Sequence, residues 1–169
     1  MIQIIPFSEH HLPGVIEVIL PIQQSEFNIP ITLDAQPDLL DIPDFYQKGK
    51  GGFWVALNGS EIVGTMALLD IGNSQGALRK MFIKEKFRGS MHSVARRLLR
   101  VFLDWCKRHD VREIYLGTTT KFLAAHRFYE KSGFSEIDKS RLPVSFPVMS
   151  VDTKFYKYCI VNCAAQRTF

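Results

Sequence analysis

The sequence lacks any apolar run that approaches the roughly 20 residues needed to span a bilayer. Residues 1–11 also lack the basic start and the long apolar stretch of a secretory signal peptide. Internal repeats and low-complexity segments are absent from the sequence as well. We therefore expect a cytoplasmic protein that has no membrane partner.

Cysteine is scarce, and the three cysteines are Cys106, Cys159 and Cys163. A disulfide framework uses more cysteines than this, and a zinc site needs more ligands in paired spacings. The odd count favours ordinary thiols in a reducing compartment. We expect neither disulfides nor a bound metal.

Neither disorder nor a fibrous fold fits the composition, in which 46% of the residues are hydrophobic and 22% are charged. A length of 169 residues is sufficient for one domain with a proper core, and it is too short for two ordinary domains. We expect a single domain over residues 1–169.

Residues 78–134 are the most informative stretch of the sequence. A short apolar run, Met81 to Ile83, is followed by a charged turn that closes on Arg88 and Gly89, which is typical of a strand leading into an anion-binding loop. Residues 90–109 are predicted to form an amphipathic helix, because apolar side chains recur there at helical spacing. These side chains are Val94, Ala95, Leu98, Leu99, Phe102, Trp105 and Cys106.

The start of this helix is suited to a phosphate group. Its small residues, Ser90, Ser93 and Ala95, allow a ligand to approach the backbone. The first N–H groups of a helix lack intrahelical partners and lie at the positive end of the helix dipole. Each such contact stabilises an anion by roughly 0.3–1 kcal/mol, so several amides must act together.

Two further elements complete this stretch. Residues 112–120 alternate between apolar and other side chains and are predicted to form a strand. Residues 122–132 are predicted to form a short helix, because Gly133 just past its end is the expected left-handed cap.

The order strand, Arg-Gly turn, helix, strand and short helix resembles the GNAT superfamily of acyl-CoA-dependent N-acetyltransferases. The short helix carries the family pattern A-x-x-x-Y-x-x-x-G-F, matched here by Ala125, Tyr129, Gly133 and Phe134. The loop departs from the usual R-x-x-G-x-G/A, since it is longer by two residues. The places of G-x-G/A are taken by Ser93, Val94 and Ala95.

The resemblance implies an α/β (α+β) fold of the GNAT acyltransferase type, with a mixed, mostly antiparallel sheet flanked by helices. It also implies an acetyl-CoA core at about residues 52–135 and a variable acceptor region at about residues 8–50.

The cosubstrate implied by the resemblance is acetyl-CoA. The strand at Met81 to Ile83 would follow the pantetheine arm, with a backbone N–H as oxyanion donor, and the loop and helix start would hold the pyrophosphate. The residues that we expect to contact the coenzyme are Met81, Phe82, Ile83, Arg88, Gly89, Ser90, Ser93, Val94, Ala95, Arg96, Thr118 and Ala125.

Tyr129 is the candidate catalytic residue, because the family places its tyrosine close to the thioester sulfur. A phenol with a pKa of about 10 is suited to protonating a thiolate of similar basicity. The alternative is a core tyrosine with a hydrogen-bonded hydroxyl group.

The sequence does not identify a general base. Glu26 is the best candidate among the acidic residues, and water could relay the proton instead. We expect His92 to face solvent or phosphate and His126 to lie on an exposed helix face.

Net charge is +4, and basic residues concentrate between Arg79 and Arg108. A nucleic-acid interface would interleave such residues with exposed aromatic side chains, whereas the aromatics here fall on apolar faces. An acidic coenzyme accounts for the basic patch, and we expect no nucleic-acid partner.

The N-terminal third is predicted to begin with a strand at Ile2 to Ile5 and a helix that starts at Ser8, which Pro21 kinks or splits. A short helix over residues 38–47 is expected to be interrupted near Pro43. Its acidic residues would suit a cationic amine, or they are solvated caps and turn residues. They are Glu26, Asp34, Asp38, Asp41 and Asp44.

The remaining elements are mostly strands. Asn58 and Gly59 between two β-rich runs predict a hairpin, and residues 72–76 predict the next turn. Strands are also expected over residues 135–140 and 153–161, joined through an extended loop.

The leading functional hypothesis is an N-acetyltransferase that acts on a small-molecule or peptide amine. An acyl-CoA-binding sensor that lacks turnover is the alternative from another class. A homodimer is compatible with either.

Overall fold

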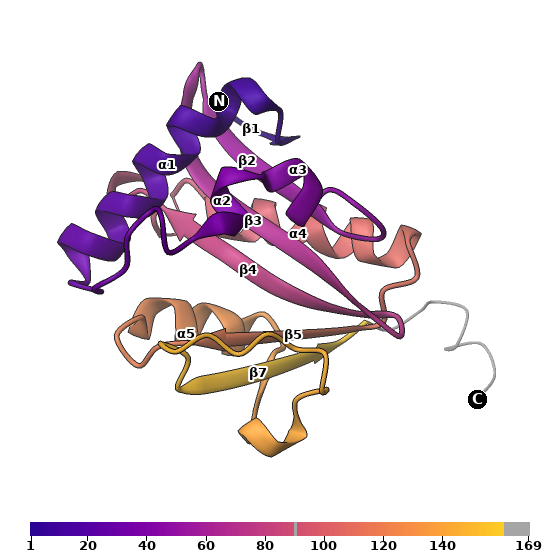
Figure 1. Ribbon diagram of the computed structural model, residues 1–169. Helices are drawn as coiled ribbons and strands as arrows, with labels where there is room; N and C mark the ends of the chain where they lie inside the picture. The colour runs from indigo at the N-terminus through magenta and orange to yellow at the C-terminus, as the bar shows by residue number, and fades with distance from the viewer. Residues whose placement is uncertain (90, 161–169) are drawn as a thin grey trace.

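The computed structural model describes residues 1–89 and 91–160. A seven-stranded sheet with the strand order β1-β2-β3-β4-β5-β7-β6 runs through the molecule (Figure 1). Among the described strand pairs, only β4 and β5 are parallel. The strands are β1 (Ile2–Pro6), β2 (Gly52–Asn58), β3 (Glu61–Gly72), β4 (Gln75–Ile83), β5 (Glu113–Thr118), β6 (Ser135–Ile137) and β7 (Lys154–Cys159). The expected mixed, mostly antiparallel sheet is confirmed.

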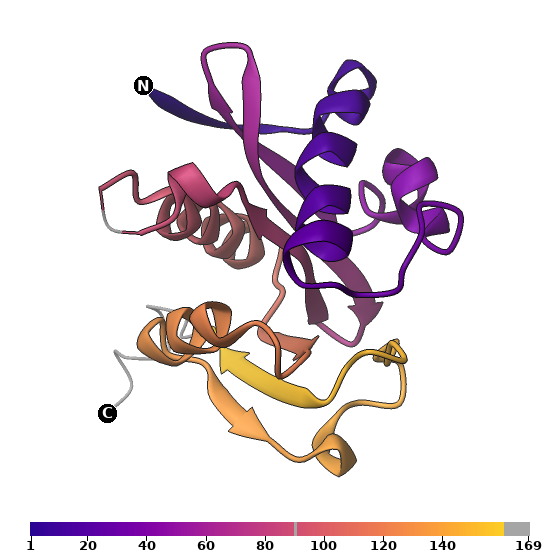
Figure 2. The same cartoon turned by 90° about the vertical axis from the view of Figure 1, so that its left-hand side faces the viewer.

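Helices cover both faces of the sheet. Figure 2 shows α1 (Leu12–Pro21) and α4 (Val94–Arg108) on opposite sides of the N-terminal strands, with α5 (Leu123–Lys131) on the side of α4. The short helices α2 (Pro37–Leu40) and α3 (Ile42–Phe45) lie on the side of α1. None of the described helices is long and apolar enough to cross a membrane.

Two expected helix interruptions are found. The first helix changes at Pro21, where α1 ends and a π-helical turn, η2 (Ile22–Glu26), follows. The interruption expected near Pro43 lies at Asp41, two residues before the proline. Asp41 caps α3 by accepting a hydrogen bond from the N–H of Asp44 at 3.4 Å, and Pro43 occupies the first turn, where its missing N–H costs nothing.

The core consists of one apolar layer on each face. Alternate side chains of β2 enter the two layers, with Trp54 on the face of α4 and Phe53 on the face of α1. Leu98 and Phe102 of α4 are fully buried, as their helical spacing predicted. The predicted amphipathic helix is confirmed, although it begins at Val94.

Both predicted hairpins are confirmed. β2 and β3 are joined after Asn58, and Gly59 has a φ of +63°. The β3–β4 turn contains Asn73 and Ser74, with φ values of 54° and 57°, as a type I′ turn requires. Short 3₁₀ turns also occur, and they are η1 (Glu9–His11), η3 (Glu85–Phe87) and η4 (Lys139–Arg141).

The sheet opens between β4 and β5. Within the described residues these strands pair only from Gln75 to Ala77, after which they separate, while β5 continues to pair with β7 as far as Thr118. Beyond Ala77 the backbone of β4 therefore has no neighbouring strand on the side of β5. Figure 2 views the open end of this gap.

A β-bulge interrupts β4 at the same level. Ala67 pairs with Arg79 and Thr65 pairs with Phe82, so β4 has one more residue than β3 over this interval. Lys80 in the bulge has a φ of 54°, and its carbonyl accepts a hydrogen bond from the Thr65 hydroxyl at 2.7 Å.

Candidate active site

A cavity of about 1010 Å³ occupies the gap between β4 and β5. Residues 78–83 form one wall, and residues 117–119 with α5 form the opposite wall. Residues 87–89 and the start of α4 enclose one end, while residues in the range 146–152 and the segment after η2 also line the cavity.

Eleven of the thirteen residues that the sequence predicted for the site line this cavity. They are Met81, Phe82, Ile83, Arg88, Gly89, Ser93, Ala95, Arg96, Thr118, Ala125 and Tyr129. Ser90 lies outside the described residues. The side chain of Val94 is buried in the core, so only its backbone can face a ligand.

The start of α4 presents backbone donors to one end of the cavity. Gly89 has a φ of +92° and Ser93 has a φ of 52°. These two left-handed backbone conformations precede the first residue of α4. The first N–H groups of α4 lack intrahelical acceptors, and Arg96 adds a cation beside them. This end has the donors that a pyrophosphate requires.

Arg88 connects the coenzyme end to the acceptor region. Its two terminal nitrogens pair with the two carboxylate oxygens of Glu26, one of them at 2.7 Å, and its Nε donates to the carbonyl of Ile83 at 2.8 Å. Since this ion pair engages both oxygens of Glu26, and Glu26 does not line the cavity, its carboxylate is not placed to act as a general base.

Tyr129 lies on the wall formed by α5 and is 5% exposed. The rings of Phe134 and Tyr156 pack around it with centroids at 5.5 and 5.8 Å. Burial, reinforced by nearby Tyr156, raises the pKa of Tyr129, so the phenol keeps its proton at neutral pH. Within the described residues its hydroxyl group makes no hydrogen bond, and Tyr129 lines the cavity.

Neither His92 nor His126 lines the cavity. His126 is buried, with Nε2 2.9 Å from the carbonyl oxygen of Thr119, so the expectation that it would be exposed was wrong. The side chain of His126 points inward, where its contact with Thr119 links α5 to the end of β5. His92 is half-buried against Phe87, with ring centroids 5.1 Å apart.

A buried polar network that sequence analysis missed lies beneath the acceptor side. Tyr46 donates its hydroxyl hydrogen to Asp38 at 2.6 Å, and Lys80 donates to Gln36 at 2.6 Å and lies 3.3 Å from Asp38. Gln36 also exchanges hydrogen bonds with Gln23 at 2.9 and 3.2 Å. Burial lowers the pKa of Lys80, an effect that Asp38 opposes.

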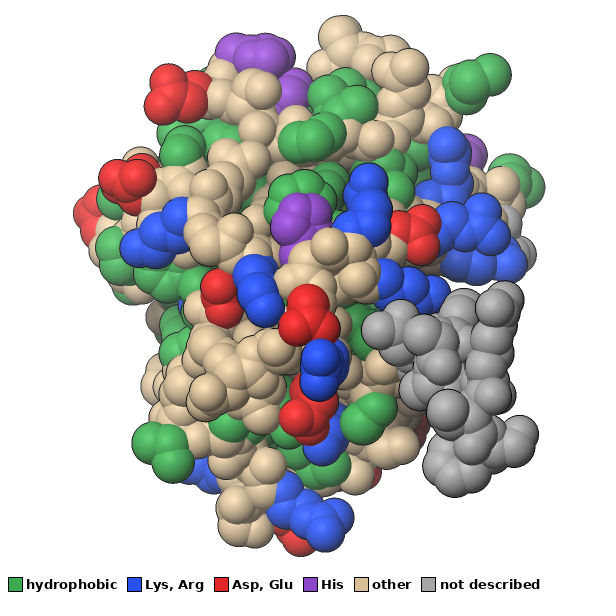
Figure 3. All heavy atoms as spheres, turned by 90° about the vertical axis from the view of Figure 1, so that its right-hand side faces the viewer, with side chains coloured by type: hydrophobic (Ala, Val, Ile, Leu, Met, Phe, Trp, Pro, Cys, Tyr) green, Lys and Arg blue, Asp and Glu red, His purple; other side chains and the backbone are tan. Residues whose placement is uncertain are grey.

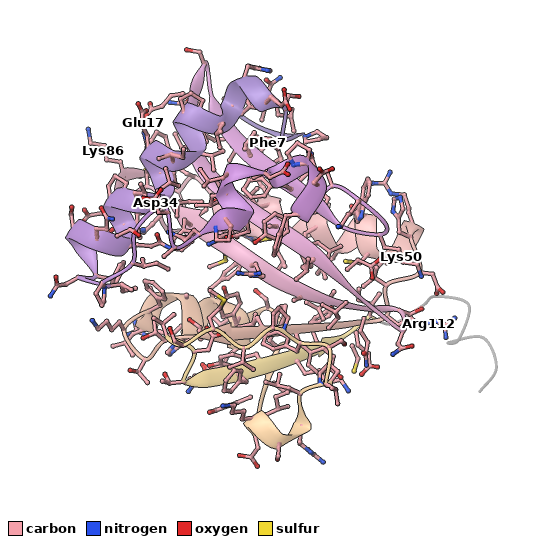
Figure 4. All side chains as sticks on the ribbon, viewed as in Figure 1. Phe7, Glu17, Asp34, Lys50, Lys86 and Arg112 are labelled. Atoms are coloured by element: carbon pink, nitrogen blue, oxygen red, sulfur yellow. The ribbon has the colours of Figure 1, made fainter. Side chains whose placement is uncertain are left out.

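The acidic residues of the acceptor region do not line the cavity. Asp38 is buried in the network, while Asp34, Asp41 and Asp44 are exposed, and Figure 4 shows Asp34 on the segment that precedes α2. Among the described residues that line the cavity, seven are basic and only Asp152 is acidic. The basic ones are Arg79, Lys80, Arg88, Arg96, Lys121, Arg127 and Lys131. The acidic bias of residues 26–44 therefore does not provide a site for a cationic amine.

Several charges outside the cavity are paired. Lys50 and Arg112, labelled in Figure 4, both approach Asp110, at 4.0 and 2.9 Å. Along the middle of the face in Figure 3, basic and acidic side chains lie next to one another. Among the described residues, no group of three or more His, Cys, Asp or Glu side chains is placed to hold a metal ion.

Comparison with protein families decides the identity of the fold. Residues 16–134 match the model of the acetyltransferase (GNAT) family. The chain belongs to the GNAT family. An acetyltransferase of this GNAT family from Staphylococcus aureus Mu50 is 40% identical and superposes with a TM-score of 0.91 over 95% of this chain and 100% of that one. The predicted family and fold class are confirmed.

Two other GNAT comparisons are informative. The N-acetylaspartate synthetase of Mus musculus is 36% identical over 106 residues, which are 61% of this chain and 34% of the relative. The chain thus spans about a third of that relative's length. An N-acetyltransferase from Thermoplasma acidophilum, solved in complex with coenzyme A, shares the fold at a TM-score of 0.70 and 15% identity, covering 94% of this chain and 99% of that one.

Proposed function

We propose that the protein transfers an acetyl group from acetyl-CoA to the primary amine of a small molecule, by direct attack within a ternary complex. The observation that carries this proposal is the continuous cavity between the separated strands, with phosphate donors at one end and Tyr129 on its wall. The N-acetylaspartate synthetases, by their name, form a small N-acetylated product, which supports a small-molecule acceptor.

The coenzyme fits the donor groups of the cavity. The backbone amides at the start of α4, with Arg96, would hold the pyrophosphate. The unpaired edge of β4 at residues 81–83 would lie along the pantetheine arm, where an N–H group can stabilise the oxyanion. The same fold holds coenzyme A in the Thermoplasma protein.

The reaction requires few side chains. The neutral amine attacks the thioester carbon, the C–N bond forms, and the tetrahedral intermediate then loses its C–S bond. Tyr129 gives the departing thiolate its proton, the proton lost by the amine passes to solvent water, and Tyr129 regains a proton from solvent before the next turnover. Because the walls hold both reactants in place, positioning alone supplies several kcal/mol of the barrier reduction.

The first test measures acetyl-CoA binding by calorimetry and thiol release with a panel of amines. We expect Tyr129→Phe to bind acetyl-CoA as the native protein does and to lose about 100-fold or more in kcat, because it keeps the ring and removes the proton donor. Tyr158→Phe is the matched control, since Tyr158 does not line the cavity and should retain full turnover.

Tight acetyl-CoA binding without thiol release from any amine would support the acyl-CoA sensor instead. Unchanged kcat in Tyr129→Phe would remove the tyrosine from the mechanism.

The sequence alone supports the further proposals that the protein is cytoplasmic and that it acts without a metal ion, a membrane or a nucleic acid.

A further inference from the structure

Arg79 is a buried cation whose hydrogen-bonding capacity is barely used. Its side chain is 12% exposed and lines the cavity. Within the described residues, its guanidinium group donates only to the thioether sulfur of Met149 at 3.5 Å. The nearest carboxylate oxygen in an ion pair with it belongs to Asp38 and lies 3.9 Å away, beyond hydrogen-bond distance.

Neighbouring side chains hold this guanidinium group in place. Its central carbon lies over the rings of Phe45 and Tyr46, at 5.6 and 5.9 Å from their centroids. Adjacent residues of a regular strand point to opposite faces, but the bulge at Lys80 lets Arg79 and Lys80 both reach Asp38. Tyr46 donates a hydrogen bond to the Asp38 carboxylate and Lys80 pairs with it, so the N–H groups of Arg79 remain available to a ligand in the cavity.

Asp152 is the acidic counterpart on the facing loop. Its Oδ2 accepts a hydrogen bond from the N–H of Met149 at 2.9 Å, and its carboxylate lies against Gly117 at the end of β5. Asp152 lines the same cavity as Arg79, yet no ion pair joins the two within the described residues. Burial raises the pKa of Asp152, and the charge of Arg79 opposes this effect. Two opposite charges that face one cavity without a direct ion pair match a ligand that carries both charges.

The position of this pair separates it from the coenzyme end. Arg79 lies two residues beyond the last β4–β5 pair, near the closed end of the gap, whereas Arg88 and the start of α4 lie at the far end of β4. Arg79 is therefore placed for the second substrate, and the pyrophosphate is provided for elsewhere.

We propose that the acetyl acceptor is a free amino acid, whose carboxylate is bound by the guanidinium group of Arg79 and whose amino group is held by Asp152. This inference rests on the proposed acetyl transfer. A planar guanidinium group binds a carboxylate through two parallel hydrogen bonds, a geometry that a lysine cannot reproduce.

The first arm of the test needs no variant. Thiol release from acetyl-CoA is measured with the free amino acids, and the best of them is compared with its amide and its decarboxylated amine. We expect loss of the substrate carboxylate to lower kcat/KM by about 10- to 100-fold, chiefly through KM. Arg79 then loses its charge-assisted hydrogen bonds to that carboxylate. For an acceptor with two carboxylates, each is converted to its amide in turn.

The second arm uses Arg79→Gln and Arg79→Lys. Arg79→Gln should lower kcat/KM for the amino acid by about 10- to 100-fold and leave the slow reaction of the amide within about threefold of the native value. Arg79→Lys should recover only part of the loss, because it restores charge without the planar pair of donors. Acetyl-CoA affinity and the melting temperature, measured on both variants, establish that they are folded.

Arg127→Gln is the matched control, because Arg127 is another cation of the cavity wall and its side chain is exposed on α5. It should keep the native preference for the acid over the amide. Equal use of acid and amide, or a preference for amines without a carboxylate, would overturn this inference and leave the acetyltransferase intact. Absence of turnover with every amine, despite acetyl-CoA binding, would reject both.

Discussion

Gly117 is the residue at which the smallest change should disturb the acceptor side of the cavity. A Cβ atom added there would lie 2.6 Å from Oδ2 and 2.7 Å from Cγ of Asp152. Gly117→Ala should therefore displace Asp152 and raise KM for the acceptor by about tenfold, with a stability loss of about 1–3 kcal/mol from overpacking. Steady-state kinetics at saturating acetyl-CoA, together with urea unfolding, measure both effects.

A double variant checks the origin of this effect. In an Asp152→Ala background, Gly117→Ala should change KM little further, because the two atoms that it would meet most closely, Oδ2 and Cγ, have been removed and only Cβ of residue 152 remains, at 3.1 Å. Full additivity of the two substitutions would show that Gly117 acts on the site through some other contact.

Single residues also show which parts of the site could be predicted from sequence. Tyr129 and Gly133 lie in one helix and its cap, so their spacing was visible in the chain. The contact between Lys80 and Asp38 joins residues 42 positions apart. It depends on a β-bulge that no local sequence pattern predicts. His126 was misplaced for the same reason, since its partner is a backbone carbonyl at the end of another element.

Elements were predicted well where periodicity or turn chemistry was strong. The apolar face of α4 and the two hairpins follow from side-chain spacing and from small or turn-forming residues. The interruption of the helix was predicted near Pro43 and lies two residues earlier, at Asp41, because proline is tolerated in a first helical turn and Asp41 caps α3. The separation of β4 from β5 depends on tertiary packing, which no local pattern in the sequence shows.

The β3–β4 turn offers a prediction at this scale. Ser74 has a φ of 57°, a conformation that costs a residue with a Cβ atom more than it costs glycine. Ser74→Gly creates the favoured Asn-Gly turn and should raise the free energy of unfolding by about 0.5–1 kcal/mol. Urea unfolding measures the change.

A comparison variant at the same position sharpens this test. Ser74→Val should destabilise the protein, because a β-branched side chain is strained at positive φ. Loss of stability in Ser74→Gly would mean that the contact of the Ser74 hydroxyl with Asp110, at 3.4 Å, outweighs the backbone gain.

Among the interior strands of the sheet, pairing is shortest between β4 and β5. These strands share three residue pairs, as many as the short edge strand β6 shares with β7, whereas β3 and β4 share seven and β5 and β7 share six. A ligand that lies along both walls of the gap should therefore stabilise the molecule as a unit. At 100 times its dissociation constant, acetyl-CoA should add about 2.7 kcal/mol to the free energy of unfolding.

Hydrogen exchange locates this stabilisation. Acetyl-CoA should slow amide exchange at residues 78–83 as well as at the start of α4. ADP, which lacks the pantetheine arm, should protect the helix start and leave the strand unchanged. Protection confined to α4 with both ligands would contradict the proposed path of the coenzyme along β4.

The boundary between β4 and β5 in the sheet also divides the sequence into two consecutive stretches. Strands β1 to β4 and α4 precede Asp110, while β5 to β7 and α5 follow it. Each stretch therefore carries one wall of the cavity. A protein cut at this turn would yield two fragments that share the core on the face of α4, and the coenzyme should promote their reassembly by binding both walls, as in a ligand-responsive split reporter.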